Sequence, residues 1–503
     1  MMGRQQRVQK KLFYTKFSLD QRVPKNHILR KVSKYIDFDF IYKEVKDKYG
    51  SKGNVSVPPP VILKMMLLLV FYNVRSEREL MSTIPVRLDW LWFLGYDLDD
   101  DVPNHSVLSK ARSRWGVEVF QSFFDRIVIQ CVHAGLVDGS KLFMDSSNVQ
   151  ADASNNSVVN KEDIKRYLKK SYQLFEKRLE KEDIENDDDD MNPPKTGVAN
   201  KKHFSTTDPD ASVHRQGGRS KLKYKIHRSV DEKNEIITAT TVTTGSVNEA
   251  HLLKPLLDSH EKTTAIKPEI CVADSKYGII DNYLTCYELG IKSHFESYEK
   301  AHRGSGRQKG IFSKEAFVYN PQTDTFICPE GEELRRRRFS KQRRQWEYTA
   351  PLSVCSNCSS FSKCTRSKTG RSLKRHERQN ELDAMLTHCE SKESRRDIRK
   401  RQHLMERSFA RSTRYGFKRA RWRRQWRVRI QELLTASLQN IMVYIRNVKD
   451  QSTTAVAGCR IRPLKPCKAL NLEKLAAFLN IRVPLMPWHV KMSTILCCQK
   501  VIV

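Results

Sequence analysis

Two short apolar runs, each followed by an aspartate, limit most strongly what this chain can fold into. Leu142-Phe143-Met144 leads into Asp145, and Ile270-Cys271-Val272-Ala273 leads into Asp274. Runs of this length, rich in large apolar side chains, are typical of buried strands. We therefore predict two core strands, each ending on a carboxylate.

The segment between these runs supplies the rest of a sheet. Lys223–Val230 and Ile236–Thr243 have strand patterns, and the polar residues 231–234 between them suit a hairpin turn. The leucines of Leu252–Leu257 then have helical spacing. Strand, hairpin, helix and strand in this order predict an α/β fold with a mixed sheet.

The N-terminal part of the chain has a helical pattern instead. Its longest apolar run, Val61–Tyr72, has 12 residues and contains Lys64. That is too short to cross a bilayer of about 30 Å, so we predict a buried core helix and no membrane partner. Gly116 separates two short helical stretches, which is compatible with a helix-turn-helix, although the pattern favours an ordinary helical bundle with solvated charges.

Changes in composition divide the chain into five parts. We predict an all-helical domain over 1–138, a first part of an α/β core over 139–295 with a polar insertion at about 155–218, a basic cysteine-containing insertion over 296–392, C-terminal helices over 393–450, and a tail of unassigned role over 451–503.

The charge of the chain indicates a polyanionic partner. The formal net charge is +33, and residues 395–429 contain fifteen Lys or Arg against two acids. Such an excess favours nucleic acid binding, while the basic start without a following apolar stretch predicts a cytoplasmic protein. The residues that we expect to contact DNA are Lys110, Arg112, Arg114, Arg335, Arg336, Arg411, Arg414, Lys418, Arg419, Arg421 and Arg423.

Three carboxylates are candidates for metal chemistry. Asp145 and Asp274 follow neighbouring strands, and Glu406 lies in a basic, helix-like stretch. Carboxylates gathered in this way suit paired Mg²⁺ ions, which prefer oxygen ligands, although strand-end aspartates are more often turn or helix caps. Other acids compete for these roles: Asp152, Asp208, Asp281 and Glu393.

Four cysteines form a second candidate metal site. Cys355, Cys358 and Cys364 follow Cys328 within the basic insertion. Four thiolates close a tetrahedral zinc site, and the Cys-x2-Cys pair suits a zinc knuckle. The alternative is a set of reduced thiols, and Cys389 leaves the number of ligands open.

An ordered set of motifs resembles the transposases of bacterial insertion sequences. It comprises FYTKFSLDQRVPKNHILR at 13–30, SEREL at 76–80, WFLG at 92–95, PNHSVLSKAR at 103–112, FMDSSNVQADAS at 143–154, TDPDA at 207–211, YKIH at 224–227, VTTGSVNEAHLL at 242–253, VADSKYG at 272–278 and ERSFARSTRYGFKRARWR at 406–423. The likeness covers roughly residues 13 to 447, and the motifs follow the order of the family.

This resemblance implies an RNase H-like DDE transposase of the IS-four/IS-five type. It implies that 1–138 is a DNA-binding domain and that 139–295 and the helices over 393–450 form the catalytic core. Asp145 and Asp274 match the two catalytic aspartates of the family, and Glu406 matches its glutamate. The family cuts element ends with Mg²⁺ or Mn²⁺ and joins the 3′-hydroxyl to target DNA, which implies double-stranded DNA as partner, a homodimer on that DNA and association with the bacterial nucleoid.

The chain departs from the family around the glutamate. Many relatives carry Tyr, Arg and Lys where this chain has Arg399, Gln402 and Thr413; Arg401, Arg411 or Arg414 could supply the missing charge. Two alternatives therefore stay open beside the transposase. One is an inactive, transposase-derived DNA-binding protein, and the other is a metal-dependent nuclease that cuts without joining.

Overall fold

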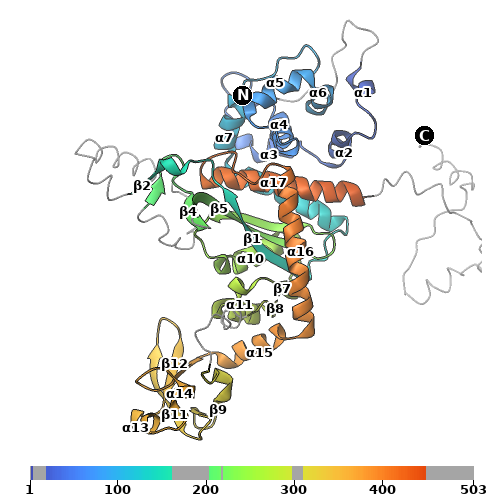
Figure 1. The fold of residues 1–503 in the computed structure, drawn as a ribbon. Coiled ribbons are helices and arrows are strands. Elements are labelled where there is room, and N and C mark those ends of the chain that lie inside the picture. The colour runs from blue at the N-terminus through green and yellow to red at the C-terminus, as the bar shows by residue number, and fades with distance from the viewer. Residues whose placement is uncertain (1, 4–17, 161–202, 217–218, 297–309, 449–503) are drawn as a thin grey trace, which may run out of the picture. The chain divides into compact units, whose positions relative to one another are not determined.

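A computed structural model describes residues 2–3, 18–160, 203–216, 219–296 and 310–448 (Figure 1). The predicted tail over 451–503 and much of the polar insertion, including its acid run Asp187–Asp190, lie outside the described residues.

A mixed sheet forms the centre of the fold, as the sequence predicts. Its strands follow the order β4-β5-β1-β7-β8, and β6 pairs with β5. The pairs β1–β5 and β5–β6 are antiparallel, whereas β1–β7 and β7–β8 are parallel. The strands are β1 Lys141–Gln150, β4 Ser212–Gln216, β5 Arg219–Asp231, β6 Ile237–Thr244, β7 Ile270–Val272 and β8 Lys292–His294.

The first predicted strand is longer than expected. Strand β1 does not end on Asp145, because β5 continues to pair with it as far as the register Gln150↔Lys223. On its other edge, β7 pairs only with Lys141–Phe143. Asp145 therefore lies in the middle of β1, beside an edge that β7 leaves uncovered, while Asp274 follows β7 closely, as predicted.

Helices fill the described N-terminal part of the chain. They are α1 Leu19–Arg22, α2 Ile28–Tyr35, α3 Ile41–Glu44, η1 Lys46–Lys48, α4 Pro59–Phe71, α5 Glu77–Thr83, η2 Ile84–Val86, α6 Leu88–Leu94 and α7 Ser106–His133. Helix α4 begins with prolines, which suit a first turn because their missing N–H groups would have no helical partner.

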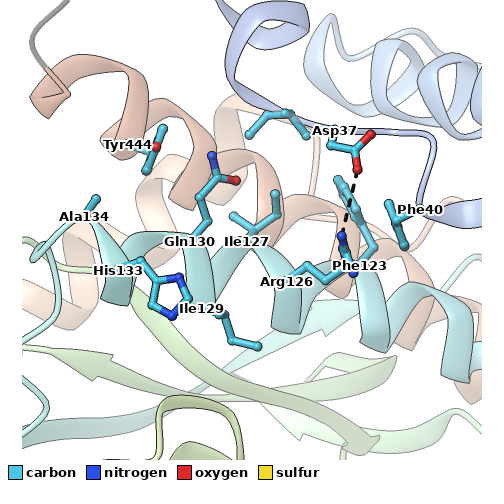
Figure 2. Close-up of a pocket in the computed structure, with 11 residues that line it drawn as sticks. Asp37, Phe40, Phe123, Arg126, Ile127, Ile129, Gln130, His133, Ala134 and Tyr444 are labelled. Atoms are coloured by element: carbon cyan, nitrogen blue, oxygen red, sulfur yellow. Dashed lines mark ion pairs between the residues drawn. The ribbon is translucent and has the colours of Figure 1, made fainter. Parts of the chain in front are cut away.

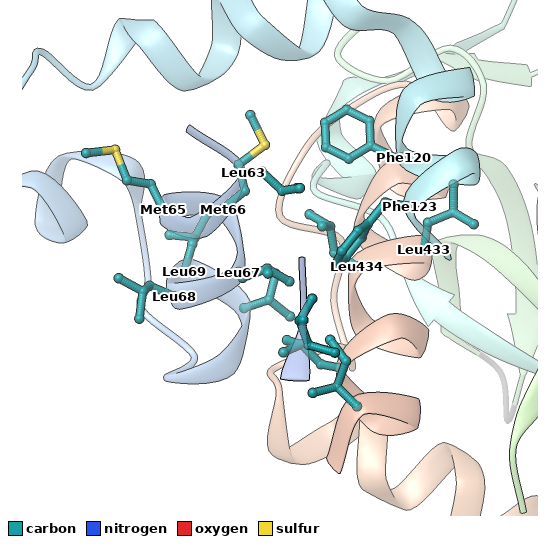
Figure 3. Packing of buried hydrophobic residues seen from close by; sticks show 14 of the residues in the cluster. Leu63, Met65, Met66, Leu67, Leu68, Leu69, Phe120, Phe123, Leu433 and Leu434 are labelled. Carbon is teal, nitrogen blue, oxygen red and sulfur yellow. The ribbon is translucent and has the colours of Figure 1, made fainter. Parts of the chain in front are cut away.

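Helix α4 is the predicted core helix. Nearly all of its side chains are buried, and its leucines and methionines belong to one cluster with Phe120 and Phe123 of α7 and with Leu433 and Leu434 of α17 (Figure 3). Within the described residues, no helix is both long enough and apolar enough to span a membrane.

The helix-turn-helix interpretation of Gly116 is wrong. Gly116 has φ 75° and interrupts α7, but the residues on both sides are helical, without the three- to four-residue turn of that motif. The second half of α7 buries Phe120, Phe123 and Ile127 in the core. Gly116 therefore marks a kink within a packed helical bundle.

The basic insertion forms a sheet that the sequence did not predict. Its five strands follow the order β13-β12-β11-β10-β9, with every neighbouring pair antiparallel. A small core of Phe317, Phe326, Leu334, Tyr348 and Leu373 supports it. Its elements are η6 Lys314–Ala316, β9 Val318–Asn320, β10 Thr325–Ile327, β11 Glu333–Ser340, β12 Gln345–Thr349, α13 Leu352–Ser356, α14 Phe361–Cys364 and β13 Ser372–His376.

The stretch predicted as a structureless polar insertion also contains strands. Besides β4, it forms η3 Asn155–Ser157 and the antiparallel pair β2 Val158–Asn160 and β3 His203–Ser205. The remaining elements of the core are η4 Glu249–Leu252, α10 Leu253–Thr264, η5 Ser275–Tyr277, α11 Ile280–Leu289 and α15 Gln379–Cys389.

Two long helices complete the core. Helix α16, Lys392–Arg414, packs against β1, β7 and β8, and helix α17, Gln425–Asn447, packs against α7 and β6 (Figure 1). The sequence predicted α17 as an amphipathic helix with one apolar side. Its residues from Ile430 to Ile441 are all buried, because neighbouring elements cover it on more than one side.

Candidate metal centre and nucleic-acid interface

Three carboxylates converge where β1 extends past the end of β7. Asp145, Glu249 and Asp274 each offer an oxygen atom, and these atoms all lie within 4.8 Å of one another. Asp145 comes from β1, Asp274 precedes η5, and Glu249 begins η4. Of the predicted acids, the fold therefore brings Asp145 and Asp274 together, and it adds Glu249.

Burial makes the two aspartates of this cluster harder to ionise than exposed aspartates. Burial raises the pKa of Asp145 to about 6, although the Arg401 guanidinium lowers it. Burial also raises the pKa of Asp274, and repulsion from Glu249 adds to the effect. A cluster of hard oxygen donors whose negative charges repel one another fits a divalent cation such as Mg²⁺.

Glu249 differs from the two aspartates because it already has polar partners. Lys276 Nζ lies 2.9 Å and Lys225 Nζ 3.3 Å from its Oε1 atom, and the Ser146 hydroxyl donates to its Oε2 atom. Burial alone would raise the pKa of Glu249, but the hydrogen bonds from Ser146 and Lys276 hold it below its usual value. Glu249 is therefore an ionised carboxylate on a side chain that is almost fully buried.

The sequence analysis did not single out Glu249 as a candidate. The residue lies within the motif VTTGSVNEAHLL, directly after Asn248, whose side chain accepts a hydrogen bond from Ala250 N and caps η4. An acid at the start of a helix is common on protein surfaces. Only the fold reveals that this one is buried against Ser146.

Arg401 of α16 provides the positive charge at this cluster. Its guanidinium forms an ion pair with the Asp145 carboxylate, and both side chains are mostly buried. The sequence analysis named Arg401 as one of three residues that could supply the charge missing at Gln402. The structure thus brings Arg401 to the first predicted catalytic residue.

Glu406 lies on the same helix but outside the cluster of three acids. It is exposed, and Gln402 Nε2 donates a hydrogen bond to it at 3.2 Å. Thr413, at the second departure from the family pattern, lines a cavity further along α16. The structure therefore places Glu406 on the helix that borders the metal centre, without bringing it to Asp145 and Asp274.

Buried ion pairs fix α16 against the sheet. At its start, Asp397 accepts from Lys141 at 2.9 Å and contacts His294 Nδ1 at 2.8 Å. Further along, Arg228 of β5 pairs with Glu432 of α17 and donates to the hydroxyls of Ser408 and Ser412. These contacts set where Arg401 and Glu406 lie relative to β1.

The competing acids do not join the cluster. Asp152 pairs with Arg419 and Arg423, and Asp208 accepts a hydrogen bond from the Tyr224 hydroxyl at 2.6 Å. Glu393 lies 3.4 Å from Lys141 Nζ, and Asp281 lies in the first turn of α11.

The four cysteines of the insertion lie near one another but do not form a closed set. Burial raises the pKa of the Cys364 thiol, and Cys355, Cys328 and Cys358 add to this shift. Among the described residues, however, the group of three acids is the one set of at least three Cys, His, Asp or Glu whose ligand atoms lie within 4.8 Å of one another. Cys389 lies apart, buried against Ser293.

The predicted DNA-contacting residues fall into two groups. Several have partners within the fold: Arg112 is buried beside Glu77 and over the Trp422 ring, Arg336 pairs with Asp324, Arg411 pairs with Glu235, Arg419 and Arg423 pair with Asp152, and Arg421 donates to Asn73. The others have exposed side chains: Lys110, Arg114, Arg335, Arg414 and Lys418. Because Arg112 is buried, its guanidinium packs α7 against Trp422 and does not contact a DNA phosphate.

A separate cavity lies between α7 and α17. It has a volume of about 460 Å³, and Phe40, Phe123, Ile127 and Tyr444 line it together with the Asp37–Arg126 ion pair (Figure 2). None of the three clustered acids lines it. This cavity is therefore distinct from the metal centre.

Two family models match separate parts of the chain. Residues 17–114 match a family described as Transposase domain (DUF772), and residues 327–445 match a Transposase DDE domain. The second match includes Arg401, Glu406 and the whole of α16. No curated protein and no solved structure matches the chain significantly.

Proposed function

We propose that the chain is a DDE transposase of insertion sequences, which cuts DNA at the ends of its element and joins the 3′-hydroxyl to target DNA. The matches to a transposase domain and to a transposase DDE domain support this proposal. The observation that carries the proposal is the convergence of Asp145, Glu249 and Asp274 within 4.8 Å. The proposal includes the IS-four/IS-five type, because the sequence motifs resemble those of transposases of this type.

Asp145, Asp274 and Glu249 would hold a divalent cation, and Glu406 would be a further ligand. Glu249 is already at the cluster, and Glu406 lies on α16, whose Arg401 contacts Asp145. Two ions, Mg²⁺ or Mn²⁺, would need more oxygen ligands than three carboxylates supply, which favours a role for Glu406 as well. Metal ions in such a centre activate the attacking oxygen and stabilise the leaving oxygen on phosphorus.

The residues of the chain itself orient the DNA. Lys276 lies beside Glu249 and keeps more than half of its side chain exposed, so that it can bind a phosphate next to the metal ligands. Arg401 neutralises Asp145 in the absence of a cation, and its charge remains available to the substrate phosphate when a cation binds Asp145. Phosphoryl transfer needs positioning and charge stabilisation more than covalent help from the protein.

The core is assigned to the RNase H-like class. The resemblance implies this class, and the position of Asp145 on β1 and of Asp274 just after the neighbouring parallel strand β7 of a mixed sheet supports it. The exposed arginines of β11 and the exposed Lys110 and Arg114 of α7 are proposed to contact duplex DNA outside this core. A homodimer on DNA follows from the need to hold two element ends together.

A zinc ion in the insertion is a second part of the proposal. The electrostatic influence of Cys328, Cys355 and Cys358 on Cys364 supports a shared site. Thiolates are the preferred ligands of structural zinc, and bound zinc would draw the four sulfur atoms together.

The test uses a linear DNA fragment that carries both ends of the element encoding this chain. Wild-type protein with Mn²⁺ should cleave the ends and join them to a target plasmid. The variants Asp145→Asn, Asp274→Asn, Glu249→Gln and Glu406→Gln should bind the fragment but lose both steps. Asp258→Asn, at an exposed residue of α10, is the matched control.

Each outcome has a distinct meaning. Cleavage without joining would support a nuclease, and binding without cleavage by the wild type would support an inactive DNA-binding protein. If Glu406→Gln keeps full activity while Glu249→Gln loses it, Glu406 is removed from the set of metal ligands.

A further inference from the structure

A basic cavity lies beside β1, close to the metal centre. It has a volume of about 570 Å³, and residues of β1, of the neighbouring strands β4 and β5, of the C-terminal part of α16 and of the segment that follows α16 line it. Its β1 residues begin with Ser147, two residues after Asp145, and thus about 7 Å further along the strand. The cavity is therefore next to the carboxylates without containing any of them.

The lining of this cavity combines positive charge with an aromatic ring. Lys221 and Lys418 are exposed and contribute ammonium groups, and Lys223 also lines the cavity. Phe409 and Thr413 come from α16 on the opposite side. Phosphate groups bind lysines, and sugars or bases pack on aromatic rings, so this composition fits one strand of nucleic acid.

The open edge of β1 also carries backbone groups that a phosphate could use. Gln150 directs its backbone N–H to Lys418 O and its carbonyl to Ala420 N, away from β5. Because backbone groups repeat every second residue in a strand, those of Asn148 point to the same edge. At this edge, β7 pairs with β1 only as far as Phe143 and does not reach Asn148.

We propose that this cavity binds the phosphodiester backbone of the DNA strand that is cut, next to the phosphate at the metal centre. Lys221 and Lys418 contact phosphate oxygens, the Asn148 N–H donates to one of them, and the Phe409 ring packs against a sugar or base. This inference rests on the proposed transposase function for the identity of the strand. Its contribution is to name the residues that hold the strand beside Asp145.

The first test measures binding of fluorescein-labelled DNA of random sequence, single-stranded and duplex, by fluorescence anisotropy between 50 and 200 mM salt. The full-length variant Lys221→Gln/Lys418→Gln should lower the slope of log K against log salt by about 1.8 on duplex or about 1.4 on single strands. The matched control is Lys254→Gln/Lys262→Gln, which removes the same charge from exposed residues of α10. Equal slopes for both pairs, or no change for the cavity pair, would overturn the proposal.

The second test changes charge without removing a lysine. Thr413→Glu introduces a carboxylate into the cavity, and Thr413→Gln is its neutral counterpart of similar size. Thr413→Glu should bind DNA at least tenfold more weakly than Thr413→Gln at 100 mM salt, with equal melting temperatures. Equal binding by the two folded variants would refute a DNA strand in this cavity.

The two proposals fail in different ways. If the cavity variants lose binding as expected but wild-type protein never cleaves element ends with Mn²⁺, the proposed transposition chemistry fails and the binding site stands. If wild-type protein cleaves and the cavity variants bind and cleave like it, the cavity proposal fails and the transposase proposal stands.

Discussion

The Arg228–Glu432 ion pair offers the sharpest test of how the fold holds α16. Both side chains are fully buried, and the two groups share hydrogen bonds of 2.7 and 2.8 Å. Arg228 also donates to Ser408 and Ser412, and Thr240 donates to Glu432. Removing one partner leaves the other charge buried without compensation, which typically costs about 3–5 kcal/mol.

We therefore expect Glu432→Ala and Arg228→Met each to destabilise the protein by about 3–5 kcal/mol. At about 2–4 °C per kcal/mol for a unit of 150–250 residues, the melting temperature should fall by at least about 6 °C. Differential scanning fluorimetry of the full chain measures this shift. Because three acceptors remain for Arg228 when Glu432 is removed, the lower end of the range is expected for Glu432→Ala.

The double variant Arg228→Met/Glu432→Leu distinguishes a buried-charge effect from simple loss of packing. Replacing both charges by apolar side chains of similar volume removes the uncompensated charge, so the double variant should melt above either single variant. The exposed pair Lys254–Asp258 is the control, since breaking it should shift the melting temperature by about 1 °C or less. A double variant that loses the sum of both single effects would refute the reasoning.

Four further predictions concern particular residues. Because burial raises the pKa of Asp145 to about 6, Mn²⁺ must compete with a proton for this carboxylate at low pH. The affinity for Mn²⁺, measured by calorimetry, should rise about tenfold per pH unit below pH 6 and level off above it, and an affinity that does not depend on pH would contradict the prediction. Without metal, the same raised pKa means that the Asp145 contribution to stability falls as pH rises from about 4 to 6, because the folded state binds the proton more tightly than the unfolded state. Elemental analysis should find one zinc per chain, lost in Cys355→Ser, and purified protein without zinc would end that proposal. Gly116→Ala should lower the free energy of unfolding by about 1–2 kcal/mol, because φ at this position is 75°. Gly50→Ala is the control, since Gly50 has open space around it and the substitution should change the stability little. Equal melting curves for the two variants would show that the kink at Gly116 tolerates a side chain.

Much of the central fold is predictable from local sequence patterns. The hairpin of β5 and β6, the core helix α4 and the strand before Asp274 all have patterns set by their immediate neighbours. The length of β1 is not predictable in this way. Ser146–Gln150 contain one apolar residue, Val149, among polar ones, and they form a strand only because they pair with β5. The sheet of the insertion was missed for a related reason: its strands are short and rich in arginine, and few of their side chains are buried.

The candidate site was predictable in part. Asp145 and Asp274 are marked by the apolar runs before them, whereas Glu249 depends on burial that only the fold creates. The role of Arg112 was misjudged because a basic residue on a helix gives no local indication that Glu77 and Trp422 enclose it. The position of Glu406 was expected from the resemblance, and its relation to the metal ligands remains a prediction for the Glu406→Gln variant to test.

The contacts that fix α16 also have a consequence for how the chain folds. Lys141 and Asp397 are 256 positions apart in sequence, and so are Asp145 and Arg401, while Arg228 and Glu432 are 204 apart. Contacts at such separations form late, because a long loop must close before they are gained. During synthesis, the parts of the sheet that α16 and α17 cover in the folded protein therefore stay exposed until the insertion and both helices have left the ribosome. The metal centre receives its arginine only in the last stage of folding, so that an incomplete chain carries the acids without the helix that orients them.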